Sequence, residues 1–235
     1  MTSLGDKAEA FADEVATTIT AALGTRPRII AEALDDRFVV RTVDRGIQLR
    51  VDSAPIMALT CRWECELDHR GEYLSVSRSE FRVFVEGDRV PVFRFDFRKD
   101  PSGDVPSAHL QVHAERVSVG WALGRAGSTT NRARRRGRGS VASLSSIHLP
   151  VGGSRFRPAL EDVLQMLIDE FGVDATDGWR RHLEDGRELW RRKQLRSAVR
   201  DAPAEAAAAL RHLGFAVTDP AVGIPPERRE KLRRP

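Results

Sequence analysis

The sequence predicts an α+β protein with an N-terminal helix, an antiparallel meander sheet of about six or seven strands, and a C-terminal segment of three helices. Three observations lead to this prediction. Apolar residues recur at helical spacing near the N-terminus, alternate with polar residues through the middle of the chain, and return to helical spacing after Pro158. With 235 residues and 41% hydrophobic content, the chain is long and apolar enough to bury a large core.

The first helix is predicted from Ser3 to Leu23. Its apolar stripe consists of Leu4, Ala8, Phe11, Val15, Ile19 and Ala22. Ser3 is a suitable N-cap, and Asp6 lies at the capping-box position three residues later. Gly24 can adopt the left-handed conformation that ends a helix. We expect the apolar stripe of this helix to pack against a sheet.

Alternation of apolar and polar residues from Arg28 to Ala114 predicts the strands of that sheet. The segment Asp44-Arg45-Gly46 separates two such runs, which predicts a short hairpin turn between them. The clearest strand runs from Met57 to Leu67. In the run that follows, the phase of the alternation slips, which predicts a β-bulge between Ser77 and Glu80.

A second hairpin is predicted from Val90 to Glu115, where two alternating runs flank a polar turn. Phenylalanines occupy one face of its first strand. The opposite face collects the side chains that can carry chemistry: Arg94, Asp96, Arg98, His109, Gln111, His113 and Glu115. A final short strand, predicted within residues 145–151, carries His148. If these strands pair, arginine, carboxylate and imidazole groups converge on one sheet face.

General acid–base catalysis is the first interpretation of this polar face. His109, His113 and His148 titrate near neutral pH, Asp96 can orient a histidine, and Arg94 can hold a phosphate or its transition-state charge. These five residues are the candidate catalytic set. No shared metal ion is expected, because four strand residues separate the rings of His109 and His113 by about 13 Å. The alternative interpretation is a polar sheet face with ordinary ion pairs, or histidines buried under a helix.

Positive charge is concentrated in one part of the chain. Residues 116–160 contain nine arginines and no acidic residue, a formal charge of +9, whereas the whole chain carries +4, so the remainder carries −5. A loop rich in Gly, Ser, Thr and Arg is predicted over residues 122–144. Six arginines are expected to bind nucleic acid through its phosphates: Arg98, Arg132, Arg134, Arg135, Arg136 and Arg138. A solvated insertion is the alternative for the loop.

Three helices are predicted to follow, from Pro158 to Phe171, from Asp177 to Arg200, and from Pro203 to Leu213. The predicted elements divide the chain into three parts. A helix-and-sheet domain spans residues 1–153, a helical segment packed on it or appended to it spans 154–216, and a flexible tail spans 217–235.

A cytoplasmic protein is expected. No apolar run approaches the roughly 20 residues that a membrane span needs, and the acidic N-terminus is unlike a signal peptide. Cys61 and Cys65 are the only cysteines; they lie on one strand about 13 Å apart, too far for a disulfide, and fit a reducing compartment. No Gly-x-x-x-x-Gly-Lys motif occurs, and no cofactor, metal or membrane partner is expected.

Three segments, taken in order, resemble toxin components of the TumE type from bacterial toxin–antitoxin pairs. They are FRFD (Phe93–Asp96), HLQVH (His109–His113) and FRPALEDVLQMLIDEF (Phe156–Phe171), and the resemblance covers about residues 90–171. It implies a toxin-like activity on nucleic acid and a cognate, antitoxin-like protein partner. The run GWRRHLEDGRELWRRKQL (178–195) resembles uncharacterised proteins of high-GC bacteria, which implies no activity.

Two hypotheses of function follow from these features. In the first, the chain acts on RNA or DNA by metal-independent, RNase-like acid–base chemistry on the polar sheet face. In the second, it is a non-catalytic interaction or scaffold module that binds a protein through the sheet face or through the long helix predicted over residues 177–200. The sequence leaves open whether the protein is an enzyme.

Overall fold

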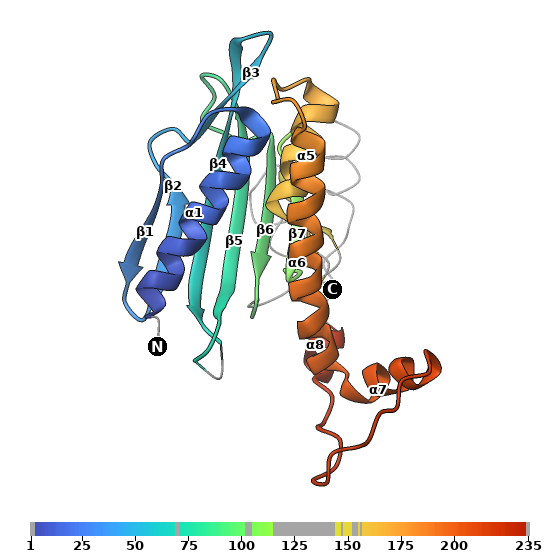
Figure 1. The fold of residues 1–235 in the computed structure, drawn as a ribbon. Coiled ribbons are helices and arrows are strands. Elements are labelled where there is room, and N and C mark those ends of the chain that lie inside the picture. The colour runs from blue at the N-terminus through green and yellow to red at the C-terminus, as the bar shows by residue number, and fades with distance from the viewer. Residues whose placement is uncertain are drawn as a thin grey trace, which may run out of the picture.

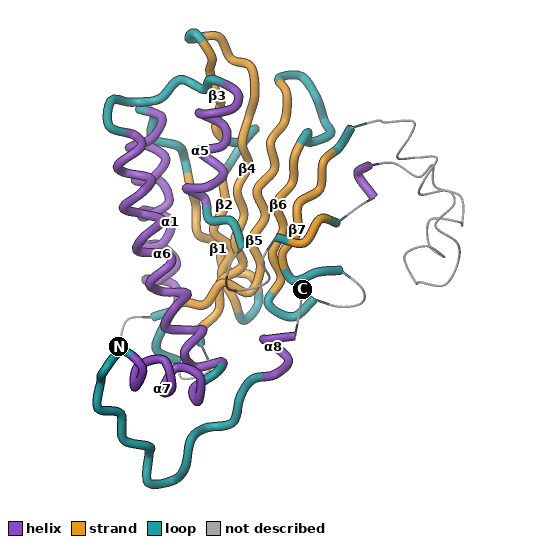
Figure 2. Tube along the Cα trace, turned by 90° about the vertical axis from the view of Figure 1, so that its right-hand side faces the viewer, coloured by secondary structure: helices purple, strands orange, loops and turns teal. Residues whose placement is uncertain are grey.

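The computed structural model describes residues 3–68, 71–101, 105–114, 144–146, 148–151, 155 and 157–233. One antiparallel sheet carries helices α1 (Leu4–Leu23), α5 (Leu160–Phe171) and α6 (Trp179–Asp201) on a single face (Figures 1 and 2). The predicted α+β architecture is confirmed. No helix in the described part of the chain combines the length and apolar character that crossing a bilayer requires.

The described sheet has eight strands, all paired antiparallel. In chain order they are β1 (Ile29–Leu34), β2 (Arg37–Thr42), β3 (Ile47–Val51), β4 (Ala54–Leu67), β5 (Leu74–Val85), β6 (Phe93–Arg98), β7 (Ala108–Val112) and β8 (Leu149–Pro150). Their order across the sheet is β1-β2-β4-β5-β6-β7-β8, and β3 pairs with β4 alone. The long strands β4 and β5 therefore form the centre of the sheet.

The predicted hairpin turn at Asp44-Arg45-Gly46 is wrong. Strands β2 and β3 do not pair with each other: both pair with β4, β2 along residues 62–65 and β3 along residues 54–59. Asp44 and Gly46 have positive φ angles of 54° and 87° and kink the chain between two strands that run in the same direction. The hairpin turn lies at Asp52 and Ser53, whose φ angles of 49° and 66° fit a type I′ turn.

The predicted β-bulge is confirmed and lies at Ser77. Glu64 is opposite Arg78 and Cys65 is opposite Val76, so Ser77 is the extra residue of β5. The Ser77 hydroxyl donates a hydrogen bond of 3.2 Å to the carbonyl of Glu64. The bulge resets the alternation, and residues beyond it keep their apolar side chains toward the helices.

The helix boundaries agree closely with the sequence pattern. The capping box of α1 is confirmed, with a hydrogen bond of 3.1 Å from the Asp6 amide to Ser3 Oγ and one of 2.9 Å from the Ser3 amide to the Asp6 carboxylate. Beyond α6 the chain forms α7 (Pro203–His212) and the short α8 (Arg229–Arg233). The sequence pattern did not predict α8.

One hydrophobic core lies between the sheet and its helices. Side chains from α1, α5, α6 and the strands join it, among them Ala8, Val15, Ile19, Val40, Leu59, Trp63, Phe81, Leu164, Leu167 and Leu183. The helices after the sheet thus share their buried surface with α1 and the strands. This packing leaves the other face of the sheet for polar side chains.

Candidate functional site

The polar residues lie on the open face of the sheet, which we define as the face turned away from α1, α5 and α6. Five of them form a row of directly opposed residues across β2, β4, β5, β6 and β7: Arg41, Arg62, Glu80, Asp96 and His109. Each of the five is next in sequence to a residue that faces the helices. Because successive side chains of a strand point to opposite faces of the sheet, all five point to the open face. The strand pairing therefore creates this row.

Arg94 lies between two carboxylates that face each other on adjacent strands. Its Nε is 2.7 Å from Asp96 Oδ2, and one terminal nitrogen is 3.0 Å from Glu80 Oε2. Like charges directly opposite in a sheet repel each other. Both carboxylates are buried, so the guanidinium between them is needed to offset this repulsion.

His109 is buried beside Asp96 and held on both sides. Its Nε2 lies 3.4 Å from Asp96 Oδ2, and its Nδ1 lies 3.2 Å from the carbonyl of Pro106. Burial alone would raise the pKa of Asp96, but His109 and Arg94 outweigh burial and hold this pKa below its ordinary value. Asp96 is therefore ionised at neutral pH.

The two remaining histidines of the candidate catalytic set, His148 and His113, lie at the ends of neighbouring segments, and only His148 contacts the ring of His109. The rings of His109 and His148 meet edge to face with centroids 4.5 Å apart, immediately before β8. His113 follows β7, and its Nε2 is buried without a hydrogen-bond partner among the described residues. Burial, followed by the charges of Arg94 and Arg82, lowers the pKa of His113, so its ring is neutral at neutral pH.

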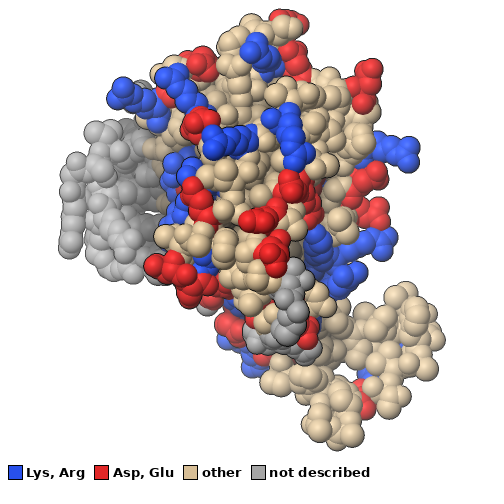
Figure 3. All heavy atoms as spheres, turned by 60° about the vertical axis from the view of Figure 1, so that its left-hand side comes forward, with Lys and Arg blue, Asp and Glu red and all other residues tan. Residues whose placement is uncertain are grey.

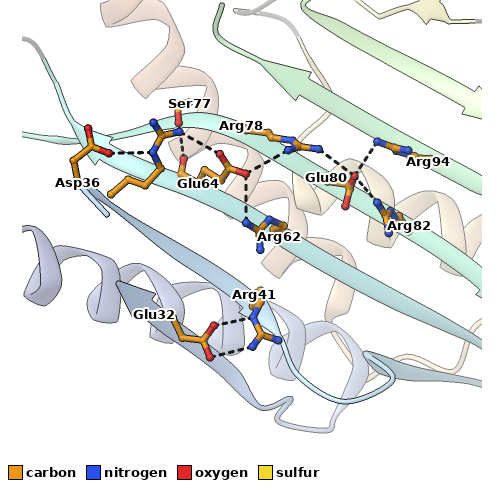
Figure 4. A network of polar contacts seen from close by, with 11 residues as sticks. Glu32, Asp36, Arg41, Arg62, Glu64, Ser77, Arg78, Glu80, Arg82 and Arg94 are labelled. Carbon is orange, nitrogen blue, oxygen red and sulfur yellow. Dashed lines mark hydrogen bonds and ion pairs between the residues drawn. The ribbon is translucent and has the colours of Figure 1, made fainter. Parts of the chain in front are cut away.

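A network of arginines and glutamates extends from this set along β4 and β5 (Figure 4). Glu64 contacts three guanidinium groups at 3.4 Å each, those of Arg37, Arg62 and Arg78. Glu80 also contacts three, those of Arg82 at 2.9 Å, Arg94 at 3.0 Å and Arg78 at 3.8 Å. Arg78 links the two clusters, so the network is continuous from β2 to β6.

The network buries its negative charges and exposes its positive ones. The side chains of Glu64, Glu80 and Asp96 are 13%, 7% and 6% exposed, whereas those of Arg62, Arg78, Arg82 and Arg94 are 26% to 39% exposed. A partner approaching the open face over β4 to β6 therefore meets guanidinium groups first. Elsewhere the charges mix: on the side shown in Figure 3, basic and acidic residues are interspersed.

The structure brings together four of the five candidate catalytic residues in direct contacts, namely Arg94, Asp96, His109 and His148. The fifth, His113, is close enough for Arg94 and Asp96 to influence its pKa. Arg98 is exposed at the end of β6, directly opposite Arg78. The other predicted nucleic-acid-binding arginines lie outside the described residues: Arg132, Arg134, Arg135, Arg136 and Arg138.

Sequence reasoning missed the residues of β5 that hold the network together, Arg78, Glu80 and Arg82. Their alternation was visible, but the bulge at Ser77 shifts the register, so the sequence alone did not show which residues of β4 and β6 they oppose. Within the described part of the chain, no group of three or more His, Cys, Asp or Glu side chains is arranged to hold a metal ion.

Comparison of the chain with known proteins gives no match to a family model, to a curated protein or to a solved structure. The resemblance to TumE-type toxins therefore stays a prediction.

Proposed function

We propose that the protein binds nucleic acid, RNA or DNA, through the arginines of the open face. The observation that carries this proposal is the layering of charge, with carboxylates buried beneath exposed guanidinium groups. Arginine forms paired hydrogen bonds with phosphate oxygens, and phosphate contacts supply most of the affinity for nucleic acid.

The buried glutamates support this proposal by fixing the arginines in place. A free arginine loses side-chain entropy when it binds a phosphate, but one already held by a carboxylate loses less. Glu64 and Glu80 each hold three arginines, and adjacent strands lie about 4.8 Å apart. The guanidinium groups thus form a preorganised surface that a chain of phosphates can follow.

The test is the affinity of the full chain for a labelled 20-nucleotide single-stranded RNA, measured by fluorescence anisotropy between 50 and 200 mM salt. The double variant Arg62→Gln, Arg82→Gln is expected to bind about tenfold more weakly at 50 mM salt. It should also flatten the slope of log K against log salt by roughly 1.4, because each lost phosphate contact removes about 0.7.

A matched control lies on the exposed side of α6. The double variant Arg181→Gln, Arg192→Gln removes the same charge, and each arginine pairs with an acidic residue four positions away. It should leave the affinity for RNA unchanged. Equal weakening in both variants, or no binding by the wild type at 50 mM salt, would rule out the open face as the site.

Two further comparisons separate the remaining interpretations. Replacing Arg134, Arg135 and Arg136 with serine measures what the predicted loop adds to the salt slope. Polyglutamate, offered in place of RNA, tests for an acidic protein partner, which the toxin resemblance would supply as an antitoxin. Tighter binding of polyglutamate than of RNA would favour the interaction-module hypothesis.

RNA cleavage on the same face is a second candidate, favoured by the state of His113. A neutral imidazole whose Nε2 has no hydrogen-bond partner among the described residues can accept a proton, and Arg94 beside it can stabilise charge on a phosphate. His113→Ala should then abolish cleavage of the labelled RNA in EDTA while the melting temperature stays nearly unchanged. Intact RNA after prolonged incubation with the wild type, or cleavage that survives in His113→Ala, would refute this role.

A further inference from the structure

In the described part of the chain, β1, β3 and β8 each pair with one neighbouring strand only, and two of these free edges are protected. β8 is two residues long and contains Pro150. The register of β3 with β4 shifts between Leu49 and Arg50, and the amide of Asp174 donates to the carbonyl of Arg50 at 2.8 Å. Short length, proline, bulges and covering segments are the usual means by which proteins keep strand edges from pairing with other chains.

β1 has none of these protections. Its residues, IIAEAL (Ile29–Leu34), include no proline or lysine, and all of them pair with β2 in one continuous register. Figure 1 shows β1 at the outer margin of the sheet. No backbone group of another described segment donates to its outer side or accepts from it. A regular, largely apolar edge of this kind can pair with a further strand.

The free backbone groups of this edge alternate along β1. The amide of Val43 donates to the carbonyl of Arg28 at 3.3 Å, so the carbonyl of Arg28 points toward β2. In an antiparallel ladder this direction reverses at each residue. The amides and carbonyls of Ile29, Ala31 and Ala33 therefore point away from β2, toward the side where the described sheet has no further strand.

The charges of this edge indicate which strand fits it. Arg28 is exposed and forms no ion pair with the described residues. Glu32, on the same face of the sheet, is also exposed and accepts a hydrogen bond of 3.0 Å from Arg41. If two copies of β1 pair antiparallel about a two-fold axis at Ile30, Arg28 of each copy lies opposite Glu32 of the other. The edge is therefore complementary in charge to a second copy of itself.

The neighbouring registers are less favourable. An axis at Ala31 would set Glu32 opposite Ile30, and an axis at Glu32 would set two like charges opposite each other, which is destabilising. The axis at Ile30 also sets Ile29 opposite Ala31, and both of these residues have outward-pointing amides and carbonyls. Backbone hydrogen bonds and side-chain pairs thus favour the same register.

We propose that β1 pairs with β1 of a second copy of this chain, in this register, to form a two-fold symmetric dimer with one continuous sheet. The pairing occupies the free edge of β1 in both copies, so assembly through it ends at two chains. Directly opposed residues point to the same face, so the two open faces lie on the same side of the joined sheet. The dimer does not depend on nucleic-acid binding and is tested without it.

Sedimentation velocity of the full chain tests the dimer. The wild type should be dimeric at about 100 μM and monomeric at about 1 μM. Arg28→Glu and Glu32→Arg each set like charges opposite each other across the axis, so each variant should dimerise at least about tenfold more weakly. Arg45→Glu, at an exposed arginine between β2 and β3, is the matched control and should dimerise like the wild type. A monomeric wild type at the higher concentration, a species larger than a dimer, or equal weakening by Arg45→Glu would overturn the proposal.

Mixing the two variants tests the register. The Arg28→Glu chain carries only acidic residues at these two positions, and the Glu32→Arg chain carries only basic ones. An equimolar mixture should therefore form a heterodimer with nearly the affinity of the wild type, although neither variant dimerises well alone. A mixture that stays monomeric would contradict the antiparallel pairing of Arg28 with Glu32 and overturn the proposal.

Hydrogen exchange of the wild type keeps the test decisive if a variant fails to fold. The amides of Ile29 and Ala31 should exchange quickly at about 1 μM and slowly at about 100 μM, because they gain hydrogen bonds only in the dimer. The amides of Ile30 and Glu32, which point toward β2, should be protected at both concentrations. Exchange at Ile29 and Ala31 that does not change with concentration would show that this edge stays unpaired and would refute the dimer.

Discussion

The charged residues of the open face stabilise the fold only as a set. Glu80 and Asp96 are buried and directly opposed, and Arg94 bridges them at 3.0 and 2.7 Å. Removing one member leaves an uncompensated buried charge, which costs more than the intact pair contributes. An arginine that we propose to contact phosphate from its outer edge can therefore also be essential to the fold through its contacts with buried carboxylates.

Asp96 should make the free energy of unfolding decrease as the pH falls into the acid range. Its pKa in the folded state lies below the ordinary value of 3.8, so its contribution is full above that value and is lost as pH falls through the folded pKa. At pH 7, Asp96→Asn should lower the free energy of unfolding by about 2 kcal/mol, because Arg94 and His109 lose an ionised partner. Urea unfolding at several pH values measures the difference between the two proteins.

The difference between wild type and Asp96→Asn should begin to shrink as pH falls below about 3.8, because the Asp96 carboxyl then takes up a proton in the unfolded state before it does so in the folded state, where its pKa is lower. A similar substitution at Glu32, an exposed partner of Arg41 on β1, serves as the control and should change stability by less than about 0.5 kcal/mol. A constant difference from pH 7 to pH 3 would mean that the Asp96 charge does not stabilise the fold.

At the scale of secondary-structure elements, local pattern predicts the existence of strands better than their partners. The run from Met57 to Leu67 and the bulge at Ser77 follow from alternation alone. The turn at Asp44-Arg45-Gly46 has the residues of a hairpin, yet the chain uses it as a kink. Residue type permits a positive φ but does not decide which strands pair afterwards.

The true hairpin turn depends on a contact from far along the chain. The carboxylate of Asp174 accepts hydrogen bonds from the amides of Asp52 and Ser53, at 3.0 and 2.8 Å. Asp174 follows α5, so nothing in the sequence near Asp52 indicates this support. The open face shows the same dependence on distant parts of the chain. Alternation predicts which residues point outward, but predicting the clusters around Glu64 and Glu80 also requires the register between strands.

At the scale of the whole molecule, the two faces of the sheet have separate roles. One face packs against the helices, and the other presents the arginine network. The helices after the sheet complete the core rather than form a unit of their own, because residues such as Leu164 and Leu183 share the core with α1. The C-terminal end of the chain is tied to this body through Asp201.

Asp201 is 1% exposed and joins segments that are far apart in sequence. Arg155, near the start of the helical segment, donates to it at 2.6 and 3.1 Å, and Arg228, immediately before α8, lies 3.7 Å away. The variant Asp201→Asn leaves both guanidinium groups beside a neutral amide. We expect it to lower the free energy of unfolding by about 3 kcal/mol, measured by urea denaturation, since breaking a buried ion pair leaves unpaired charge.

The same variant should loosen the C-terminal end before the rest of the molecule. Hydrogen exchange should accelerate in α8 and in the last turn of α6, because the amide of Arg228 also donates to the Asp201 carbonyl at 2.9 Å. Asp185→Asn, at the exposed pair with Arg181 on α6, is the matched control and should change stability by less than about 0.5 kcal/mol. If Asp201→Asn changed the free energy of unfolding and the rate of hydrogen exchange no more than Asp185→Asn does, the ion pairs of Asp201 would not hold the C-terminal end in place.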